Sequence, residues 1–181
     1  MKTKLLTFTL LSLLMVLGTN LSAQRTTAGE NYGGALNVGL GIGGYYGYYG
    51  YIGRSLPVFH LNYEFDVARN FTLAPFVTFL SYRNDKYHYN ETVIPLGVKG
   101  SLYLDQILNA NSNWDFYVAG SLGFTIVNSR WDSGYERYEG YRTARPLFLD
   151  FHVGTEYHLS SRVGLFLDLS TGVSTVGLAI H

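Results

Sequence analysis

Apolar and polar side chains alternate along much of this chain, most clearly between Leu147 and Leu159. In that segment the odd positions are Leu, Leu, Phe, Val, Thr, Tyr and Leu, whereas the even positions are mostly acids, histidines and a glycine. Successive side chains of a β-strand point to opposite faces, so this period of two residues indicates a strand. The segment predicts a strand with one apolar face and one polar face.

The same alternation recurs in seven other segments, and no segment after residue 23 keeps a helical period of 3.6 residues. We therefore expect an all-β fold class, with eight antiparallel strands in an up-and-down order. Pro75 falls inside the third strand and lacks a ladder donor, so a bulge or a strand end is expected there. Besides 147–159, the expected strands are residues 36–43, 59–66, 71–82, 94–104, 116–126, 163–170 and 175–180.

The connections between these strands differ in length. Long connections rich in aromatic and charged residues are expected at 43–53, 83–91 and 129–145. Short turns are expected at Ala68–Asn70 and Thr171–Gly172. Three of the four odd-numbered connections are long, whereas the even-numbered ones are mostly short, so one end of the sheet should carry most of the exposed loop surface.

The polar face carries too few charges to be a water-exposed surface. A soluble barrel would have about a quarter to a third of charged residues there, whereas this face is dominated by Gly, Ala, Ser, Thr and Asn. The composition favours the inverted arrangement, a closed transmembrane β-barrel with apolar side chains toward lipid and a narrow, filled lumen.

Ionisable side chains in such a lumen need partners, because an unpaired buried charge is costly. Pairing the sixth and seventh strands about Ser160–Ser161 places Asp168 opposite Gly154 and diagonal to both His152 and Glu156. We therefore expect a polar network in the lumen that shares protons. Its expected members are His60, Glu64, Lys99, Asp150, His152, Glu156 and Asp168.

The N-terminus has the pattern of a secretory signal peptide. Lys2 and Lys4 precede the apolar run Leu5–Gly18, which is shorter than a membrane-spanning helix. We expect residues 1–23 to be the signal peptide, 24–31 a short N-terminal segment and 32–181 the barrel. Loss of the two lysines leaves 11 Lys+Arg against 13 Asp+Glu, a net charge of −2, so nucleic acid is not an expected partner. The chain has no cysteine, so its stability cannot come from disulfides.

The leader, the eight alternating segments and the final hairpin GTEYHLSSRVGLFLDLSTGVSTVGLAIH carry a family resemblance. Over about residues 32–181 the chain resembles the small eight-stranded outer-membrane β-barrel proteins of bacteria, of the OmpA/OmpX and porin-like type. The resemblance implies localisation in the bacterial outer membrane, contact with outer-membrane lipids and lipopolysaccharide, and insertion by the barrel-assembly machinery. Such barrels commonly end on an aromatic residue, whereas this chain ends on His181.

The run GGYYGYYGYIG, residues 43–53, is expected to be a surface loop. The residues 39–44 match G-x-G-x-x-G, but no helix is expected after them, so they do not predict a nucleotide site. We expect no cofactor and no metal. Tyrosines and arginines in the loops predict an interaction surface for lipopolysaccharide phosphates or an extracellular ligand. Its expected residues are Tyr45, Tyr46, Tyr48, Tyr49, Tyr51, Arg54, Trp131, Tyr135, Arg137, Tyr138, Tyr141 and Arg142.

These features favour a non-enzymatic outer-membrane barrel with a structural or surface-interaction role. One alternative is an enzyme that modifies lipid A or phospholipid, with His88, or His152 with Glu156 and a nearby serine, as catalytic candidates. A second alternative is a narrow channel for ions or small solutes, lined by Lys99. A soluble ligand-binding barrel is disfavoured by the composition of the polar face.

Overall fold

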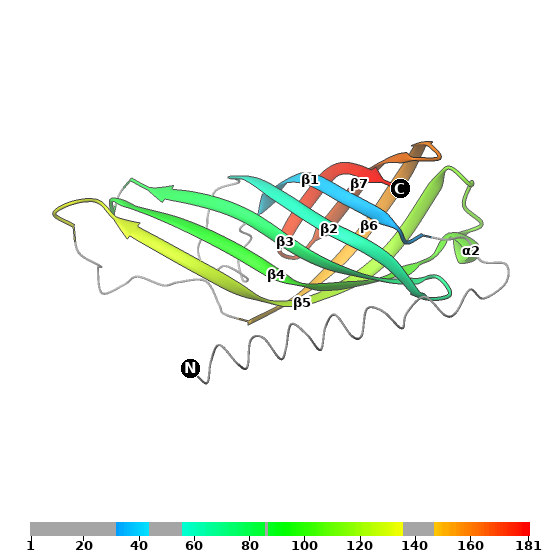
Figure 1. The fold of residues 1–181 in the computed structure, drawn as a ribbon, viewed down its shortest axis with the longest axis horizontal. Helices are drawn as coiled ribbons and strands as arrows, with labels where there is room; N and C mark the ends of the chain where they lie inside the picture. Colours follow the sequence, from blue (N-terminus) through cyan, green and yellow to red (C-terminus); the bar gives the residue numbers. More distant parts are fainter. Residues whose placement is uncertain (1–31, 44–55, 86, 136–146) are drawn as a thin grey trace. The chain divides into compact units, whose positions relative to one another are not determined.

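A computed structural model describes residues 32–43, 56–85, 87–135 and 147–181. Within these ranges eight antiparallel strands close into a single barrel in sequence order, which confirms the expected fold class (Figure 1). The expected signal peptide and N-terminal segment lie outside the described residues. The strands are β1 Ala35–Gly43, β2 Leu56–Ala68, β3 Phe71–Asn84, β4 Tyr89–Tyr103, β5 Trp114–Trp131, β6 Leu147–Ser160, β7 Val163–Ser170 and β8 Val173–Ile180.

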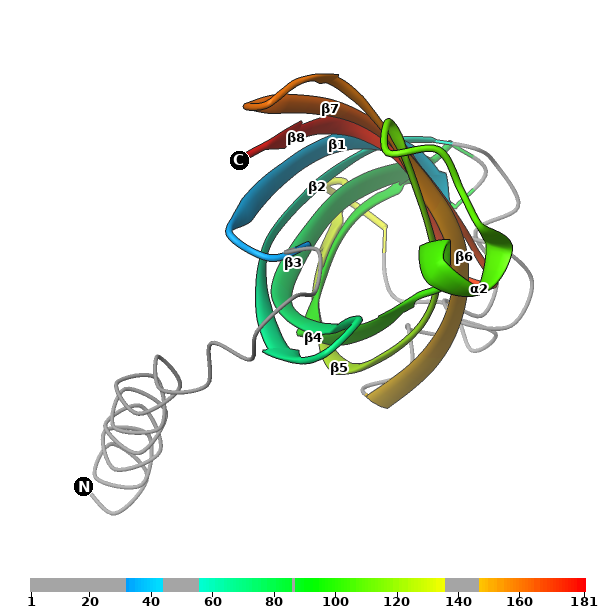
Figure 2. The same cartoon turned by 90° about the vertical axis from the view of Figure 1, so that its right-hand side faces the viewer.

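The barrel is closed by the pairing of β1 with both β2 and β8. Leu40 of β1, for example, pairs with Phe59 on one side and with Val176 on the other. Figure 2 shows the strands curving around a central axis, with β8 beside β1. Closure satisfies the backbone donors and acceptors that an edge strand would leave free.

The described part of the chain contains one helical turn, α2 (Asp105–Leu108), between β4 and β5. Asp105 accepts a hydrogen bond from the backbone N–H of Phe116 at 2.6 Å, which ties this turn to the start of β5. Gln106 accepts hydrogen bonds from Arg69 and Asn70 in the β2–β3 turn. We call this end of the barrel, which also holds His181, the turn end. None of the described helices is long and apolar enough to cross a membrane.

The opposite end, which we call the loop end, is uneven in height. β5 has 18 residues and β4 has 15, whereas β7 and β8 have eight each. In Figure 1 the ends of β3, β4 and β5 project beyond the other strands. The expectation of a long connection at 83–91 is therefore wrong, because β3 runs to Asn84 and β4 begins at Tyr89. Trp131, expected in a loop, is the last residue of β5.

Pro75 lies within β3 and neither ends the strand nor causes a bulge. It pairs with Val98 of β4, and the register between β2 and β3 is the same on either side of it. The irregularity of this strand pair falls instead between Asp66 and Ala68, next to the β2–β3 turn. The side chain of Pro75 is exposed on the outer wall. The sequence-based expectation of a break at this proline is thus wrong.

The two faces of the sheet have the expected inverted polarity. Leu147, Phe151 and Leu122 point outward with 70%, 62% and 63% of their surface exposed. Asp150 and Lys99 point inward with only 6% and 5% exposed. Toward the loop end, several inward residues are apolar, and Glu91 is also buried there. These buried apolar residues include Val58, Leu80, Tyr89, Val93 and Phe148.

Candidate functional site

The polar lumen contains a hydrogen-bonded group centred on Asp168 of β7, which we call the Asp168 network. Lys99 Nζ donates to Asp168 Oδ2 at 3.1 Å, and the Tyr117 hydroxyl donates to the same oxygen at 2.8 Å. His152 Nδ1 lies 2.6 Å from the other carboxylate oxygen, Oδ1. Lys99 also lies over the Tyr117 ring, 4.9 Å from its centroid. A carboxylate with three partners of this kind is well compensated for its burial.

Strand register explains why these residues meet. Gly154 of β6 pairs with Tyr117 of β5 on one side and with Asp168 of β7 on the other. A Cβ atom at Gly154 would lie 2.1 Å from Tyr117 Cζ, so the tyrosine ring occupies the space above the glycine. The absence of a side chain at Gly154 thereby lets Tyr117 reach across β6 to Asp168.

The network continues from His152 to a serine. Ser121 Oγ lies 2.9 Å from His152 Nε2, and His152 Nδ1 faces Asp168. Serine, histidine and aspartate in this order are the arrangement that activates a serine nucleophile in hydrolases. A cavity of about 30 Å³ adjoins Ser121 and His152. A volume of that size holds about one water molecule, and Ser121 itself is 2% exposed.

A second group, the Glu64 network, lies nearer the turn end. Glu64 Oε1 accepts hydrogen bonds from Thr72 and, at 2.8 Å, from the Tyr103 hydroxyl. Asn37 Nδ2 lies 2.9 Å from Asn62 Oδ1 and 3.3 Å from Glu64 Oε2. Tyr32 stacks on Tyr103 at 3.9 Å between ring centroids, which covers this network.

The remaining expected residues have different partners. His60 contacts Thr78 at 2.8 Å and Asn62 at 3.0 Å, which extends the Glu64 network toward the loop end. Asp150 accepts hydrogen bonds from Ser170, at 3.1 Å, and from Thr171 in the β7–β8 turn. Asp150 thereby fixes the short turn over the lumen, and its Oδ2 atom also lies 4.0 Å from His152 Nε2 of the Asp168 network.

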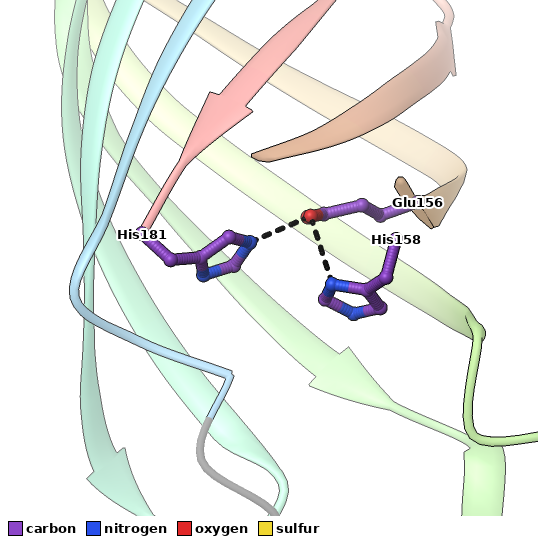
Figure 3. A group of neighbouring side chains, drawn as sticks. All are labelled: Glu156, His158 and His181. Atoms are coloured by element: carbon purple, nitrogen blue, oxygen red, sulfur yellow. Dashed lines mark hydrogen bonds and ion pairs between the residues drawn. The ribbon is translucent and has the colours of Figure 1, made fainter. Parts of the chain in front are cut away.

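Glu156 belongs to a third group at the turn end, drawn in Figure 3. Its Oε1 atom lies 2.7 Å from His181 Nε2 and 3.7 Å from His158 Nδ1. His158 Nε2 is in turn 2.8 Å from Asp115 Oδ2. His152 therefore pairs with Asp168 and Ser121, whereas Glu156 pairs with the two histidines at the end of the barrel. The enzyme alternative built on His152 with Glu156 is not supported by this geometry.

At the loop end, the described residues form a compact group of rings and ion pairs. Arg83 contacts Asp85 at 2.8 Å and Asp132 at 3.0 Å. His88 stacks on Tyr135 with ring centroids 4.1 Å apart, and Tyr89 packs against Trp131 at 4.7 Å. Two neighbouring carboxylates thus neutralise Arg83. The other expected residues of the loop surface, which are Tyr45, Tyr46, Tyr48, Tyr49, Tyr51, Arg54, Arg137, Tyr138, Tyr141 and Arg142, lie outside the described residues.

Several lumen residues were not among those expected from the sequence. Tyr103, Tyr117 and Ser121 occupy inward positions of the alternating pattern, so the pattern does indicate that their side chains face the lumen. Asp115 and His181 lie at the turn end, beyond the clearly alternating segments, and only the register of β6 to β8 brings them near Glu156. The sequence alone does not indicate that His181 lies beside Glu156.

The fold and its lumen define a small closed β-barrel with an apolar outer wall and a hydrogen-bonded polar interior. No protein-family model matches the sequence, and no curated protein matches it significantly. The closed barrel of eight strands has the architecture that the sequence resemblance implies.

Two similar solved structures are of Ail, the attachment invasion locus protein of Yersinia pestis. One is a crystal structure of Ail in complex with the heparin analogue sucrose octasulfate, with a TM-score of 0.42 and 9% identity over 80% of this chain and 92% of that chain. A second crystal structure of Ail has a TM-score of 0.42 and 9% identity, and covers 81% of this chain and 91% of that chain. The function proposed below therefore rests on the residues of this chain.

Proposed function

We propose that this chain is an integral protein of the bacterial outer membrane, a β-barrel with a filled lumen and a structural or surface-interaction role. The observation that carries the proposal is the band of large apolar side chains around the outer wall. Leu149, Val153 and Val176, from β6 and β8, are each more than half exposed. A monomer in water rarely exposes a contiguous apolar patch larger than a few hundred Å². Acyl chains are the partner that matches a band that surrounds a closed barrel.

The interior of the barrel supports a role outside the lumen. Lys99, Tyr117 and Asp168 meet at its centre, and the neighbouring cavity has a volume of about 30 Å³. A cavity of that size holds about one water molecule, which supports a lumen that is closed to solutes. The channel alternative predicts a current in planar bilayers that changes in a Lys99→Ala variant. We expect no stable conductance from the wild type or from the Lys99→Ala variant.

Interaction would then occur at the loop end. Rigid tyrosine rings beside arginines provide contact area and charge-assisted hydrogen bonds to anionic groups. Tyr135 is exposed there and stacks on His88. Outer-membrane lipids and lipopolysaccharide are the expected neighbours, with an extracellular ligand bound by the loops, and the barrel-assembly machinery is the expected route of insertion.

Cell fractionation tests the proposal directly. The expressed protein should sediment with the outer membrane, require detergent for extraction, and change its gel mobility on heating as the barrel unfolds. A mature protein that stays monomeric in buffer without detergent would contradict the proposal.

One observation favours a second candidate function, a hydrolase that acts on a lipid ester. Ser121, His152 and Asp168 are linked at 2.9 Å and 2.6 Å in the order required to activate a serine. A small fluorophosphonate probe should label Ser121 if the serine is nucleophilic, and a Ser121→Ala variant is the control. Mass spectrometry of lipid A and phospholipids, with and without expression, identifies any product. Labelling that disappears in the variant would support the enzyme over the structural role.

A further inference from the structure

The C-terminal histidine lies within a group of metal-ligand side chains. Glu156 and His158 are two residues apart on β6 and therefore project from the same face of the strand. His181 follows Ile180, the last residue of β8, at the next inward position after Ala179. One ligand atom from each of Glu156, His158 and His181 lies within 4.8 Å of the other two (Figure 3).

A glycine on the strand between these residues makes room for the group. Gly164 of β7 pairs with His158 on one side and with Ala179 on the other. A Cβ atom at Gly164 would lie 2.0 Å from Glu156 Oε1. The carboxylate of Glu156 thus fills the space that a side chain on β7 would occupy. The gap in β7 allows ligands from β6 and from the residue after β8 to meet across the intervening strand.

The orientation of His158 suits metal binding. Its Nε2 atom lies 2.8 Å from Asp115 Oδ2, and in the tautomer that suits metal binding Nε2 carries the proton and donates a hydrogen bond to this carboxylate. The lone pair of Nδ1 then points toward Glu156 Oε1, 3.7 Å away. A carboxylate that holds the second nitrogen of a histidine is the usual outer partner of a metal-bound imidazole.

From these contacts we infer that Glu156, His158 and His181 form a binding site for a Zn²⁺-class transition-metal ion at the turn end of the barrel. Two nitrogens and one carboxylate oxygen are a ligand set that Zn²⁺ takes, with a fourth position left for water. In a tetrahedral site with bonds of about 2.1 Å, ligand atoms lie about 3.4 Å apart. The separations from Glu156 Oε1 are 2.7 Å and 3.7 Å, and all three ligand atoms lie within 4.8 Å of one another, so rotations of the side chains would bring them to this spacing.

The site is open to an ion from the solvent at this end. The side chains of His158 and His181 are 27% and 19% exposed, while Glu156 is 8% exposed. The ion would connect β6 to the last residue of the chain. This inference goes beyond the proposed membrane role and does not depend on it, because the ligands are on the barrel itself.

Titration of the folded, detergent-solubilised barrel with ZnCl₂ tests the site, using protein purified without a polyhistidine tag. We expect one Zn²⁺ per chain. Glu156→Gln and His181→Phe should each weaken binding at least tenfold, since each removes one of three ligands. His181→Phe keeps an aromatic ring of similar size at this position, so this variant should fold.

Two variants separate metal binding from general structural damage. Asp115→Asn removes no ligand but should weaken binding about 10- to 100-fold, through loss of the group that orients His158. His88→Ala removes one imidazole at the loop end and should leave the affinity within about twofold, because a distant group contributes no ligand. Heat-dependent gel mobility verifies that each variant is folded. A wild-type Kd above about 1 mM, or equal binding by wild type and His181→Phe, would overturn the inference.

Discussion

Asp168 lies directly opposite Gly154 across the β6–β7 pair, and Tyr117 reaches over that glycine to donate a 2.8 Å hydrogen bond to Asp168. The contact between Tyr117 of β5 and Asp168 of β7 thus crosses β6, where Gly154 has no side chain in the way. The register of Asp168 and Gly154 follows from the short β6–β7 turn, and it is the register expected from the sequence. The Asp168 network therefore depends on a residue that takes no part in its hydrogen bonds.

Gly154→Ala should destabilise the barrel. The added methyl group would lie 2.1 Å from Tyr117 Cζ and would displace the ring from Asp168. Overpacking of this kind costs about 1–3 kcal/mol. Urea unfolding in lipid vesicles, followed by gel mobility without heating, measures the change.

Gly120→Ala is the matched control for that substitution. Gly120 lies on β5, and the only atom that its Cβ would approach within 4 Å is the backbone oxygen of Asp150, at 3.9 Å. This variant should be as stable as the wild type. A loss of stability equal to that of Gly154→Ala would mean that strand glycines matter here for backbone reasons rather than for the position of Tyr117.

Lys99→Met should also destabilise the folded barrel, because Asp168 would remain buried without its cation. Lys99 and Asp168 are 5% and 3% exposed and lie 3.1 Å apart. Removal of one partner from a buried ion pair typically costs about 3–5 kcal/mol. The double variant Lys99→Met/Asp168→Asn should recover part of this loss, which a double-mutant cycle measures.

Arg83 is an exposed cation, and its removal serves as the comparison for Lys99→Met. Arg83→Ala removes a charge that also contacts aspartates, but at the loop end, where its side chain is 48% exposed. Water and salt screen such pairs, so no measurable change in unfolding is expected. Comparable losses in the two variants would argue against a buried role for Lys99.

Single cysteines can report which face of β6 meets lipid, since the chain contains none. We expect a spin label at Leu149→Cys to collide with oxygen dissolved in the bilayer, because Leu149 is 54% exposed on the outer wall. A label at Asp150→Cys, beside it in sequence but only 6% exposed, should be shielded from the acyl chains. The reverse result would refute the inverted polarity on which the proposed function depends.

Proteolysis of intact cells should leave the chain uncut after Arg83. This residue pairs with Asn90 at the top of the β3–β4 hairpin, and a protease needs several residues of unpaired backbone. The same site should become sensitive once the barrel is unfolded in heated detergent. Rapid cleavage after Arg83 in the native barrel would show that the hairpin is frayed in the membrane.

The alternating pattern was sufficient to predict the eight strands, because each strand has one exposed apolar face and one face toward the lumen. It failed near Tyr89 and Trp131, where β4 and β5 continue beyond the apolar band. In that region the aromatic and polar residues predict a loop. The backbone stays extended there because β4 and β5 pair with each other. The prediction of a break at Pro75 is wrong because the ladder between β3 and β4 continues past this residue.

The inward position of the ionisable residues could be read from the alternation, but their partners could not. His152 lies diagonal to both Asp168 and Glu156 in the register, and only the directions of the side chains decide that it contacts Asp168. Glu156 instead points toward the end of the barrel, into the gap at Gly164. The direction of each side chain depends on which neighbouring position is a glycine that leaves space for it. That in turn depends on the register of three adjacent strands.

The uneven height of the barrel wall has a consequence for the membrane around it. Eight residues of β7, tilted by about 40°, rise only ~20 Å, whereas the apolar band of such barrels is about 25 Å tall. In the proposed outer membrane, this flank of the protein would be shorter than the bilayer is thick. Hydrophobic mismatch should therefore thin the leaflets beside β7 and β8. Lipids there would be less ordered than those beside β4 and β5, which gives the barrel one side that neighbouring molecules can distinguish from the other.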